Sequence, residues 1–295
     1  MRLETVFCNL CGSSDQQQRF RKKGHLTEET FTIVQCRGCG LMFVNPRLSE
    51  EKIQSLYDKD YFSGEGFDPF VALEEESQKI TWAARALDRI AAVKHPPVDL
   101  LEVGPGRGHF LGMAGERGFR AVGLELSDYA AQRLRQDGLQ VLQGTIDRAG
   151  IPDQSYDVVV AVEVIEHLTD PRSFFVEVAR ILRPDGLFYY ETGDIDCEQA
   201  RAQGVDWDYI RPEGHLYYFS PRTLARYLTE CGFSVRYPMW FNPTRRIARI
   251  IGHLGLIHPE RALFEGMGGA LGRRVLAAWD WLPSRRPYPM AVRRQ

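Results

Sequence analysis

The chain has 295 residues, which is enough for one large domain and a small appendage, because single domains usually run to roughly 100–250 residues. An apolar share of 44% is ordinary for a packed globular protein. The formal net charge of −2 excludes a global attraction to nucleic acid or to an anionic membrane, so any such partner must bind a local segment.

Membrane insertion and secretion are not predicted. The densest apolar run, 158–162, is far shorter than the roughly 20 residues that a membrane-spanning helix needs, and Glu163 follows it. The start of the sequence, from Met1 to Cys8, lacks the long apolar segment of a signal peptide. We therefore expect a cytoplasmic protein.

Two cysteine pairs dominate the N-terminal region, and a glycine follows each pair. The four residues, at Cys-x-x-Cys spacing, are Cys8, Cys11, Cys36 and Cys39. In a reducing compartment such spacing is typical of a metal site, and two such turns close a cage of four thiolates. No coordination position then stays open for substrate, so we predict a structural Zn²⁺ ion in a zinc ribbon over residues 1–45. We interpret the basic run 19–23 as a solvated face, with docking of substrate or nucleic acid as the alternative.

A helical connector is expected over residues 46–97. Asn45-Pro46-Arg47 ends the last strand of the ribbon, and a helix is expected to begin at 48–51. A longer helix is predicted over about 72–94. Its apolar residues at helical spacing are Ile80, Ala84, Leu87 and Ile90.

From residue 98 the sequence alternates between strands and helices. A buried strand at 98–103 is followed by a glycine loop at 104–108, a helix at 109–117 and a second strand at 120–125. Such alternation implies a parallel sheet with right-handed crossovers. A ligand is then expected at the carboxyl ends of the first strands.

The glycine loop and the acid that follows it indicate a nucleotide-like cofactor. Without side chains, the loop backbone can lie against the cofactor, and Glu125 at the tip of the second strand can accept hydrogen bonds from two ribose hydroxyls. A nicotinamide dinucleotide is the main alternative. Against it, the loop at 104–108 has G-x-G-x-G spacing, and Glu102 stands where dehydrogenases usually have an apolar residue.

Several ordered motifs over about 98–242 resemble those of class I S-adenosylmethionine-dependent methyltransferases. The run 102–108 resembles their motif I, 155–168 resembles their fourth strand, and 183–186 resembles the turn before their fifth strand. The segment 142–147 is less similar to their adenine-contacting segment, because a threonine stands where aspartate is frequent.

The resemblance implies a Rossmann-like, doubly wound, mostly parallel seven-stranded sheet beside the zinc ribbon. Residues 98–242 and a final strand at 288–295 would form this S-adenosylmethionine-binding domain. The residues expected to bind the cofactor are Glu102, Gly104, Gly106, Gly108, Glu125, Leu126, Thr145, Ile146 and Glu163. Ile146 would contact adenine through its backbone.

The whole chain also resembles bacterial methyltransferases that combine a Cys-x-x-Cys ribbon with this fold, through Asn45-Pro46-Arg47 and the pair Tyr57 and Tyr61. Many of these modify sugars or cell-surface and natural-product precursors, which implies a small-molecule acceptor. The chain is too short for the additional C-terminal domain of the sugar C-methyltransferases, so the substrate class does not transfer.

Two histidines are the candidate catalytic residues. Methyl transfer from a sulfonium is an in-line displacement, so the protein must mainly align the nucleophile with the methyl carbon. A hydroxyl or acidic carbon also gains about 10²–10⁴-fold from a general base, whereas an amine needs only its neutral form. His167 follows the fourth strand, and His215 precedes a helix expected at 221–231. A structural or cofactor-lining role is the alternative for both.

Other residues could line the site. The candidates for an aromatic wall are Trp207, Tyr209 and Tyr217, although core packing explains aromatic residues equally well. Glu191 and Asp194 could orient a polar substrate, although acids in loops are more often simply solvated.

A basic insertion is expected at 243–287, between the sixth strand and the last. It carries eight arginines against three acids, and apolar residues interleave with the arginines at near-helical spacing. We interpret it as a lid over a phosphate-bearing substrate, with peripheral contact to an anionic membrane as the alternative.

Two other functions stay open. In one, the chain methylates nucleic acid and the ribbon reads RNA or DNA, although near-neutral charge and a ribbon without interleaved basic and aromatic residues weigh against this. In the other, the chain binds the cofactor without catalysis, although the intact glycine loop and Glu125 weigh against that.

Overall fold

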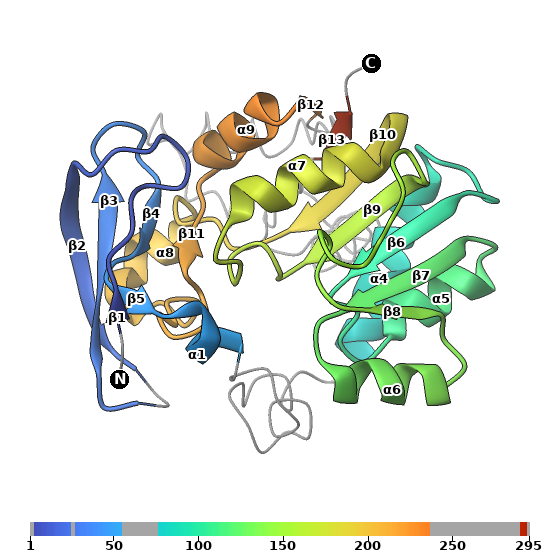
Figure 1. Cartoon of the computed structure of the whole chain (residues 1–295), viewed down its shortest axis with the longest axis horizontal. Coiled ribbons are helices and arrows are strands. Elements are labelled where there is room, and N and C mark those ends of the chain that lie inside the picture. The colour runs from blue at the N-terminus through green and yellow to red at the C-terminus, as the bar shows by residue number, and fades with distance from the viewer. Residues whose placement is uncertain (1–2, 25–26, 55–75, 237–289, 294–295) are drawn as a thin grey trace, which may run out of the picture. The chain divides into compact units, whose positions relative to one another are not determined.

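The computed structural model describes residues 3–24, 27–54, 76–236 and 290–293, and Figure 1 shows the path of the chain. None of the helices within these ranges combines the length with the apolar character that a membrane span requires. The predicted lid at 243–287 lies outside the described residues, as do Tyr57 and Tyr61.

A seven-stranded sheet forms the centre of the larger part of the chain. Its strands, in spatial order, are β12 (Phe233–Arg236), β13 (Met290–Arg293), β10 (Leu182–Glu191), β9 (Tyr156–Val162), β6 (Asp99–Val103), β7 (Arg120–Glu125) and β8 (Val141–Gln143). The strands from β10 to β8 pair in parallel, and β13 runs antiparallel to both of its neighbours. The strand order reverses between β6 and β9, which is where such sheets open a ligand crevice. The predicted fold class is confirmed.

Helices cover both faces of this sheet. One face carries α4 (Glu76–Ala91) and α5 (His109–Glu116), and the other carries α7 (Pro171–Ile181) and α9 (Pro221–Glu230), as Figure 1 shows. Alternate residues of β9 point to opposite faces, so that Val158 and Val160 pack with the first pair of helices and Val159 and Ala161 with the second. This alternation produces the doubly wound arrangement.

Local sequence signals set where these helices begin. Ser127 caps α6 (Asp128–Gln136) through its side chain, and Asp170 caps α7 in the same way. A capping box at Ser220 and Thr223 begins α9. The short α8 (Glu198–Gln203) and a 3₁₀ turn at Gly204–Asp206 follow β10 and lead toward the candidate site.

Two details of the sequence prediction were wrong. Ile80 was expected on the apolar face of the long helix, but its side chain is 44% exposed, and Ala83 and Ala86 are buried with Leu87 instead. The segment 183–186 was expected to be a turn before the fifth strand. It instead lies within β10, where the register with β9 shifts between Leu182 and Leu187.

The N-terminal region forms two small sheets. Its elements are β1 (Leu3–Glu4), β2 (Gln16–Lys23), β3 (Thr30–Cys36), β4 (Met42–Val44), β5 (Arg47–Leu48) and α1 (Glu50–Gln54). The first sheet pairs β1 with β5, and the second has the order β11-β4-β3-β2. The strand β11 is Tyr217–Tyr218, from far along the sequence. The sequence did not predict this long-range pairing.

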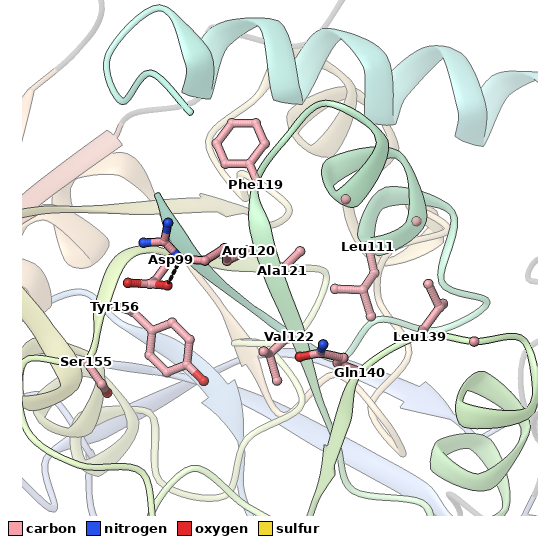
Figure 2. Close-up of a pocket in the computed structure, with 13 residues that line it drawn as sticks. Asp99, Leu111, Phe119, Arg120, Ala121, Val122, Leu139, Gln140, Ser155 and Tyr156 are labelled. Carbon is pink, nitrogen blue, oxygen red and sulfur yellow. Dashed lines mark hydrogen bonds and ion pairs between the residues drawn. The ribbon is translucent and has the colours of Figure 1, made fainter. Parts of the chain in front are cut away.

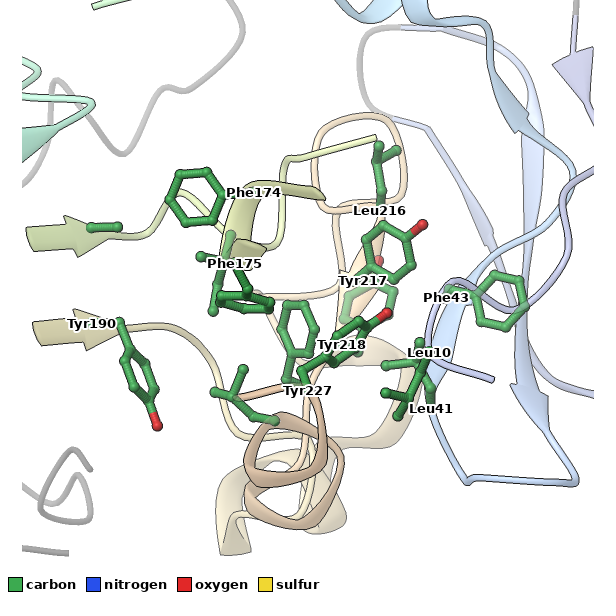
Figure 3. Packing of buried hydrophobic residues seen from close by; sticks show 14 of the residues in the cluster. Leu10, Leu41, Phe43, Phe174, Phe175, Tyr190, Leu216, Tyr217, Tyr218 and Tyr227 are labelled. Atoms are coloured by element: carbon green, nitrogen blue, oxygen red, sulfur yellow. The ribbon is translucent and has the colours of Figure 1, made fainter. Parts of the chain in front are cut away.

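The N-terminal sheets share a hydrophobic core with the larger part of the chain. Figure 3 shows Leu10, Leu41 and Phe43 beside Tyr217, and Tyr227 of α9 belongs to the same buried cluster. The N-terminal residues and the seven-stranded sheet accordingly belong to one compact unit, Met1–Arg236 with Met290–Gln295. The domain boundary at residue 45 stays a prediction.

Polar contacts reinforce this shared core. The guanidinium of Arg172 in α7 donates to the backbone carbonyls of Asn9 and Leu10 and forms an ion pair of 2.7 Å with Glu230 in α9. The side chain of Asn9 donates to Asp170 at 2.8 Å. One arginine thus joins the turn of the first cysteine pair to two helices of the larger part.

Candidate active site

The glycine loop leaves β6 at the carboxyl edge of the large sheet. Gly104, Gly106 and Gly108 have φ of +68°, +56° and +80°, a backbone conformation that other residues rarely adopt. Nothing within 4 Å would meet a Cβ at Gly106, so this part of the loop faces open space. A Cβ at Gly108 would instead lie 2.6 Å from the side chain of Leu139, so packing accounts for that glycine.

Glu125 ends β7 beside the loop and is 5% exposed. One of its carboxylate oxygens accepts a hydrogen bond of 2.8 Å from the backbone amide of Ser127. Its backbone carbonyl accepts from the amide of Gly144, after β8. Burial raises the pKa of Glu125, and the backbone amides of Ser127 and Leu126, which donate to its carboxylate, oppose the rise. The carboxylate is therefore fixed at the strand tip, where the sequence predicts ribose recognition.

Two buried polar atoms near the carboxyl ends of β6 and β8 lack a partner. Within the described part of the chain, no hydrogen-bond partner lies near Oε2 of Glu102 or Oγ1 of Thr145. A buried polar atom without a partner costs free energy, so both atoms fit a site that a polar ligand completes. Burial, with the nearby carboxylate of Glu125, raises the pKa of Glu102 to about 8.

The carboxyl of Glu102 predicts a pH dependence of stability. Its folded-state pKa of about 8 lies above the value of roughly 4.3 in an unfolded chain, so folding favours the protonated form between these values. The contribution of this group is complete below the unfolded pKa and is lost as the pH rises toward 8. In the wild type, the free energy of unfolding is therefore expected to fall by about 5 kcal/mol across this range. Glu102→Gln should remove this fall, measured by urea unfolding of the cofactor-free protein.

Asp99, at the start of the same strand, provides the control. A hydrogen bond from Arg120 lowers the pKa of Asp99, so its contribution is lost only as the pH falls below the usual range of an aspartate. Asp99→Asn should therefore keep the wild-type slope above about pH 5. If Glu102→Gln keeps the wild-type slope of unfolding free energy against pH, Glu102 is not the group that causes this pH dependence.

The other predicted cofactor residues surround the same edge. Leu126 is exposed beyond Glu125, and Ile146 is buried after β8. Glu163 follows β9 with φ of +51°, which is uncommon for a residue other than glycine, and its amide donates to the carbonyl of Glu191. Backbone strain of this kind tends to occur at functional sites. The binding roles of these residues stay predictions.

The two candidate bases lie against each other. The ring centroids of His167 and His215 are 4.6 Å apart, with an interplanar angle of 85°. Nδ1 of His215 is 2.8 Å from the carbonyl oxygen of Tyr209, and Nδ1 of His167 is 3.1 Å from that of Gly214. A carbonyl oxygen only accepts, so each Nδ1 carries a proton, and the neutral ring keeps its lone pair on Nε2.

A buried glutamate that the sequence analysis missed completes this group. Glu166 is fully buried, and its carboxylate accepts hydrogen bonds of 2.5 Å from the hydroxyl of Tyr209 and 3.0 Å from that of Thr192. Burial raises the pKa of Glu166, and these bonds oppose the rise. Its place beside His167 in the sequence was the available signal, but its partner Tyr209 lies 43 residues further on.

The three side chains form a set with two chemical uses. A carboxylate oxygen of Glu166 and one ring nitrogen each of His167 and His215 lie within 4.8 Å of one another. Two imidazoles and a carboxylate can hold a divalent cation. The same set can instead accept a proton on a histidine and stabilise the imidazolium with the carboxylate.

The three aromatic side chains that the sequence suggested as a wall of the site do not all lie at the histidine pair. The ring of Tyr209 packs against that of His215, with centroids 4.3 Å apart, so Tyr209 lines the histidine pair. Trp207 stacks on Tyr209, with centroids 4.9 Å apart, and packs behind it. Tyr217 packs against Phe43 in the N-terminal sheet instead.

Glu191 is not a solvated loop acid. It ends β10, is 1% exposed, and accepts hydrogen bonds from Trp82 at 2.8 Å and Tyr189 at 2.6 Å. Burial raises the pKa of Glu191 to about 7. Its bond to Trp82 joins the end of β10 to α4, which is a structural use of the carboxylate.

The four predicted cysteine ligands form one cluster. Sγ of Cys8 lies 3.4 Å from that of Cys39, Sγ of Cys11 lies 3.4 Å from that of Cys36, and all four sulfurs are within 4.8 Å of one another. Tetrahedral zinc with Zn–S bonds of about 2.3 Å needs sulfurs about 3.8 Å apart, so the cluster fits such an ion. Gly12 and Gly40, with φ of +74° and +85°, allow the turn after each pair.

A separate cavity of about 600 Å³ lies at the opposite edge of the sheet (Figure 2). Asp99, Arg120 and Tyr156, at the amino ends of β6, β7 and β9, line it, and the first two form an ion pair of 2.6 Å. Parallel α/β sheets bind ligands at the carboxyl ends of their strands, so this cavity is not the cofactor site.

Comparison with known proteins decides the family. The sequence profile of a family described as a methyltransferase domain matches residues 74–237, which is more than half of the chain. The chain belongs to this family. The match covers the glycine loop, Glu125 and the group of Glu166, His167 and His215, so the candidate site lies within the methyltransferase domain.

Curated relatives share parts of this domain. A malonyl-[acyl-carrier protein] O-methyltransferase of Serratia marcescens is 31% identical over 141 residues, covering 46% of this chain and 53% of that protein. A ubiquinone biosynthesis O-methyltransferase of Thiobacillus denitrificans is 28% identical over 166 residues, covering 51% of this chain and 72% of that protein. The chain thus spans only about half the length of the first of these relatives.

Solved structures are also similar to the chain. One is a SAM-dependent methyltransferase from Archaeoglobus fulgidus, with 18% identity and a TM-score of 0.49, covering 76% of this chain and 98% of that one.

Proposed function

We propose that the protein transfers a methyl group from S-adenosylmethionine to a small-molecule acceptor that must lose a proton. The observation that carries this proposal is the histidine pair, fixed by two backbone carbonyls in the tautomer with a basic Nε2. His167 follows β9, a neighbour of the strand that leads into the glycine loop. Incubation with methyl-labelled S-adenosylmethionine and a metabolite extract, followed by mass spectrometry, tests the proposal. Absence of any labelled product would contradict it.

Residues of the chain have distinct tasks in this proposal. S-adenosylmethionine, when bound, supplies an electrophilic methyl group. Glu125 and the glycine loop hold the cofactor, and the orphaned oxygens of Glu102 and Thr145 gain polar partners. His215 takes the proton of the acceptor, and Glu166 stabilises the imidazolium that forms. Tyr209, with Trp207 stacked on it, excludes water from one side of His215.

An oxygen nucleophile is the favoured acceptor atom. An amine needs no base, whereas a hydroxyl or an acidic carbon does. The printed names of the Serratia and Thiobacillus relatives are those of O-methyltransferases, which supports oxygen. The arginines at 243–287 support an acceptor that bears phosphate. Methylation of nucleic acid is the second candidate, and we place the reaction in the cytoplasm.

Loss of the ribose-binding carboxylate should weaken cofactor binding. Glu125→Ala removes a charged acceptor from a buried strand tip, so we expect the affinity for S-adenosylmethionine to fall by about 2–4 kcal/mol, or about 30–1000-fold. Glu125→Gln keeps an oxygen that can accept from the Ser127 amide but removes the negative charge, so it should show most of the loss in affinity for S-adenosylmethionine. Asp128→Asn, an exposed acid on α6, is the control. Unchanged affinity in both Glu125 variants by calorimetry would refute the assignment.

The basic segment should contribute to acceptor binding. Positive charge beside a site concentrates an anionic ligand, and salt weakens the effect because the screening length is about 8 Å at physiological ionic strength. Replacing Arg245, Arg246 and Arg249 with glutamine should raise the KM of the acceptor found above and flatten its salt dependence. The affinity for S-adenosylmethionine should barely change.

A matched variant separates this effect from net charge. Arg19, Arg21 and Arg37 are exposed on the N-terminal sheet and its adjoining turn, and their replacement with glutamine removes the same charge. This control should keep the wild-type KM. Equal effects on KM in both triple variants would contradict a local role of the basic segment. Membrane contact would be favoured if the variant of Arg245, Arg246 and Arg249 is released from anionic vesicles while its acceptor kinetics stay normal.

We further propose that Cys8, Cys11, Cys36 and Cys39 bind one structural zinc ion. The sulfur distances support this, and four thiolates fill a tetrahedral shell without leaving a position for substrate. The metal would hold the N-terminal sheets together and take no part in methyl transfer.

A further inference from the structure

The segment 207–219, here called the base segment, joins the histidine pair to the N-terminal sheet. It begins with Trp207 and carries His215, and it ends as β11 and Phe219. Tyr217 pairs antiparallel with Phe43 of β4, and the amide of Val44 donates to the carbonyl of Leu216 at 2.9 Å. The residue next to the candidate base is therefore hydrogen-bonded to the sheet that the cysteine cluster closes.

A buried carboxylate makes a second connection. Glu213, two residues before His215, is 0% exposed and accepts a hydrogen bond of 2.8 Å from the amide of Thr27, at the end of the β2–β3 hairpin. A Cβ at Gly24 would lie 2.3 Å from Oε1 of Glu213. Gly24 is not in the left-handed region, so close approach of this carboxylate explains why a glycine stands there.

Burial of a carboxylate costs free energy unless hydrogen bonds offset the cost, so an apolar side chain would be the simpler choice for packing alone. A carboxylate that must accept a hydrogen bond from the Thr27 amide instead allows the segment to pack against the hairpin in one position only. The base segment is held at its other end by Glu166, whose carbonyl accepts from the amides of Leu216 and Tyr217 at 2.8 and 3.2 Å. Both connections fix the backbone on either side of His215.

We propose that Glu213 is a positioning residue that docks the base segment into the β2–β3 hairpin and so holds His215 beside Glu166 and His167. The N-terminal sheet thereby orders the acceptor side of the site. Glu102 and Glu125 lie on strands of the other sheet, so the cofactor side does not depend on this docking. The inference rests on the proposed role of His215 as the base.

Hydrogen exchange of the zinc-loaded full chain tests the docking directly. In Glu213→Gln, amides of the base segment should exchange about tenfold faster or more, because the hydrogen bonds on both sides of His215 open locally. Exchange over 99–125 and the affinity for S-adenosylmethionine should not change. Glu28→Gln, which alters a 92% exposed carboxylate near the same hairpin end, should match wild type.

A steric variant and its rescue make the test independent of charge. Gly24→Ala should accelerate exchange in the base segment as Glu213→Gln does, because its methyl group meets the carboxylate. Adding Glu213→Asp shortens that side chain and should restore part of the protection. The ring signal of His215 in NMR spectra, assigned by its loss in His215→Asn, should move in Gly24→Ala and return toward its wild-type position in the double variant.

Several results would overturn the inference. One is slow, wild-type amide exchange of the base segment in both Glu213→Gln and Gly24→Ala. Another is exchange over 99–125 that accelerates as much as exchange of the base segment, because this would mean general unfolding. With the acceptor in hand, Glu213→Gln should lower kcat without changing the KM for S-adenosylmethionine. If Glu213→Gln opens the segment while His215→Asn keeps its full rate, the docking stands and the proposed base is wrong.

Discussion

Cys36→Ser is expected to release the zinc ion and unfold the N-terminal sheets. Structural zinc in small peptides contributes about 10–16 kcal/mol of apparent binding free energy, and a four-thiolate site that loses one ligand loses most of its affinity. The purified protein should contain about one zinc per chain by elemental analysis, and the variant close to none. Thermal unfolding should begin at a markedly lower temperature.

The loss should extend beyond the ribbon itself. Leu10 and Phe43 share a buried cluster with Phe175 and Tyr227, so unfolding the N-terminal sheets would expose apolar surface on α7 and α9. The Cys36→Ser variant should therefore bind a hydrophobic dye that wild type does not bind.

Cys197→Ser is the matched control for this experiment. Cys197 lies outside the cysteine cluster, and its sulfur accepts from the amide of Ala200 at the start of α8, a capping task that serine performs well. This variant should keep its zinc and its stability. A metal-free wild-type preparation with full stability would contradict the structural role of the metal.

The features predicted well from the sequence are those that neighbouring residues encode. The loop at 104–108 and Glu125 follow adjacent strands, and the fold needs left-handed backbone at all three glycines of the loop. The cysteine pairs likewise carry their geometry within four residues each, and the sulfurs do meet. In both cases a short spacing sets the backbone geometry of each loop or turn.

The features that were missed depend on contacts between distant residues. The two-residue strand β11 is too short to show a period, and it is a strand only because β4 lies beside it. Glu166 is one of several acids near His167 in the sequence, and only the folded chain brings Tyr209 and Thr192 into hydrogen-bond contact with it. Gly24 resembles an ordinary turn glycine until the carboxylate of Glu213 is found against it.

His215→Asn is expected to lower kcat about 10²–10⁴-fold, which is the usual contribution of a general base. The asparagine amide can still donate to the carbonyl of Tyr209, so the local backbone should stay in place while the basic nitrogen is lost. The affinity for S-adenosylmethionine should not change, because the proposed ribose acceptor Glu125 ends β7, whereas His215 lies in the loop before β11. Labelled product formation with the acceptor identified above provides the rate.

Further variants assign the proton transfer to one side chain. His95→Asn alters an exposed histidine after α4 and should keep the wild-type rate. Glu166→Gln should reduce kcat as well, because the imidazolium loses its buried counter-charge. Added imidazole should restore part of the rate of His215→Ala, because it can enter the vacated space and accept the proton.

A divalent cation at the same three side chains would give a different pattern. Chelator treatment too mild to remove the proposed zinc ion from the four cysteines should not affect a histidine base. It would abolish a reaction that needs a cation between Glu166, His167 and His215. Recovery of the rate on adding Mg²⁺ or Zn²⁺, together with failure of imidazole to rescue His215→Ala, would contradict the base and assign the three residues to a metal. A wild-type rate that is insensitive to chelator, with imidazole rescue, would leave proton transfer to His215 as the role consistent with its fixed Nδ1–H.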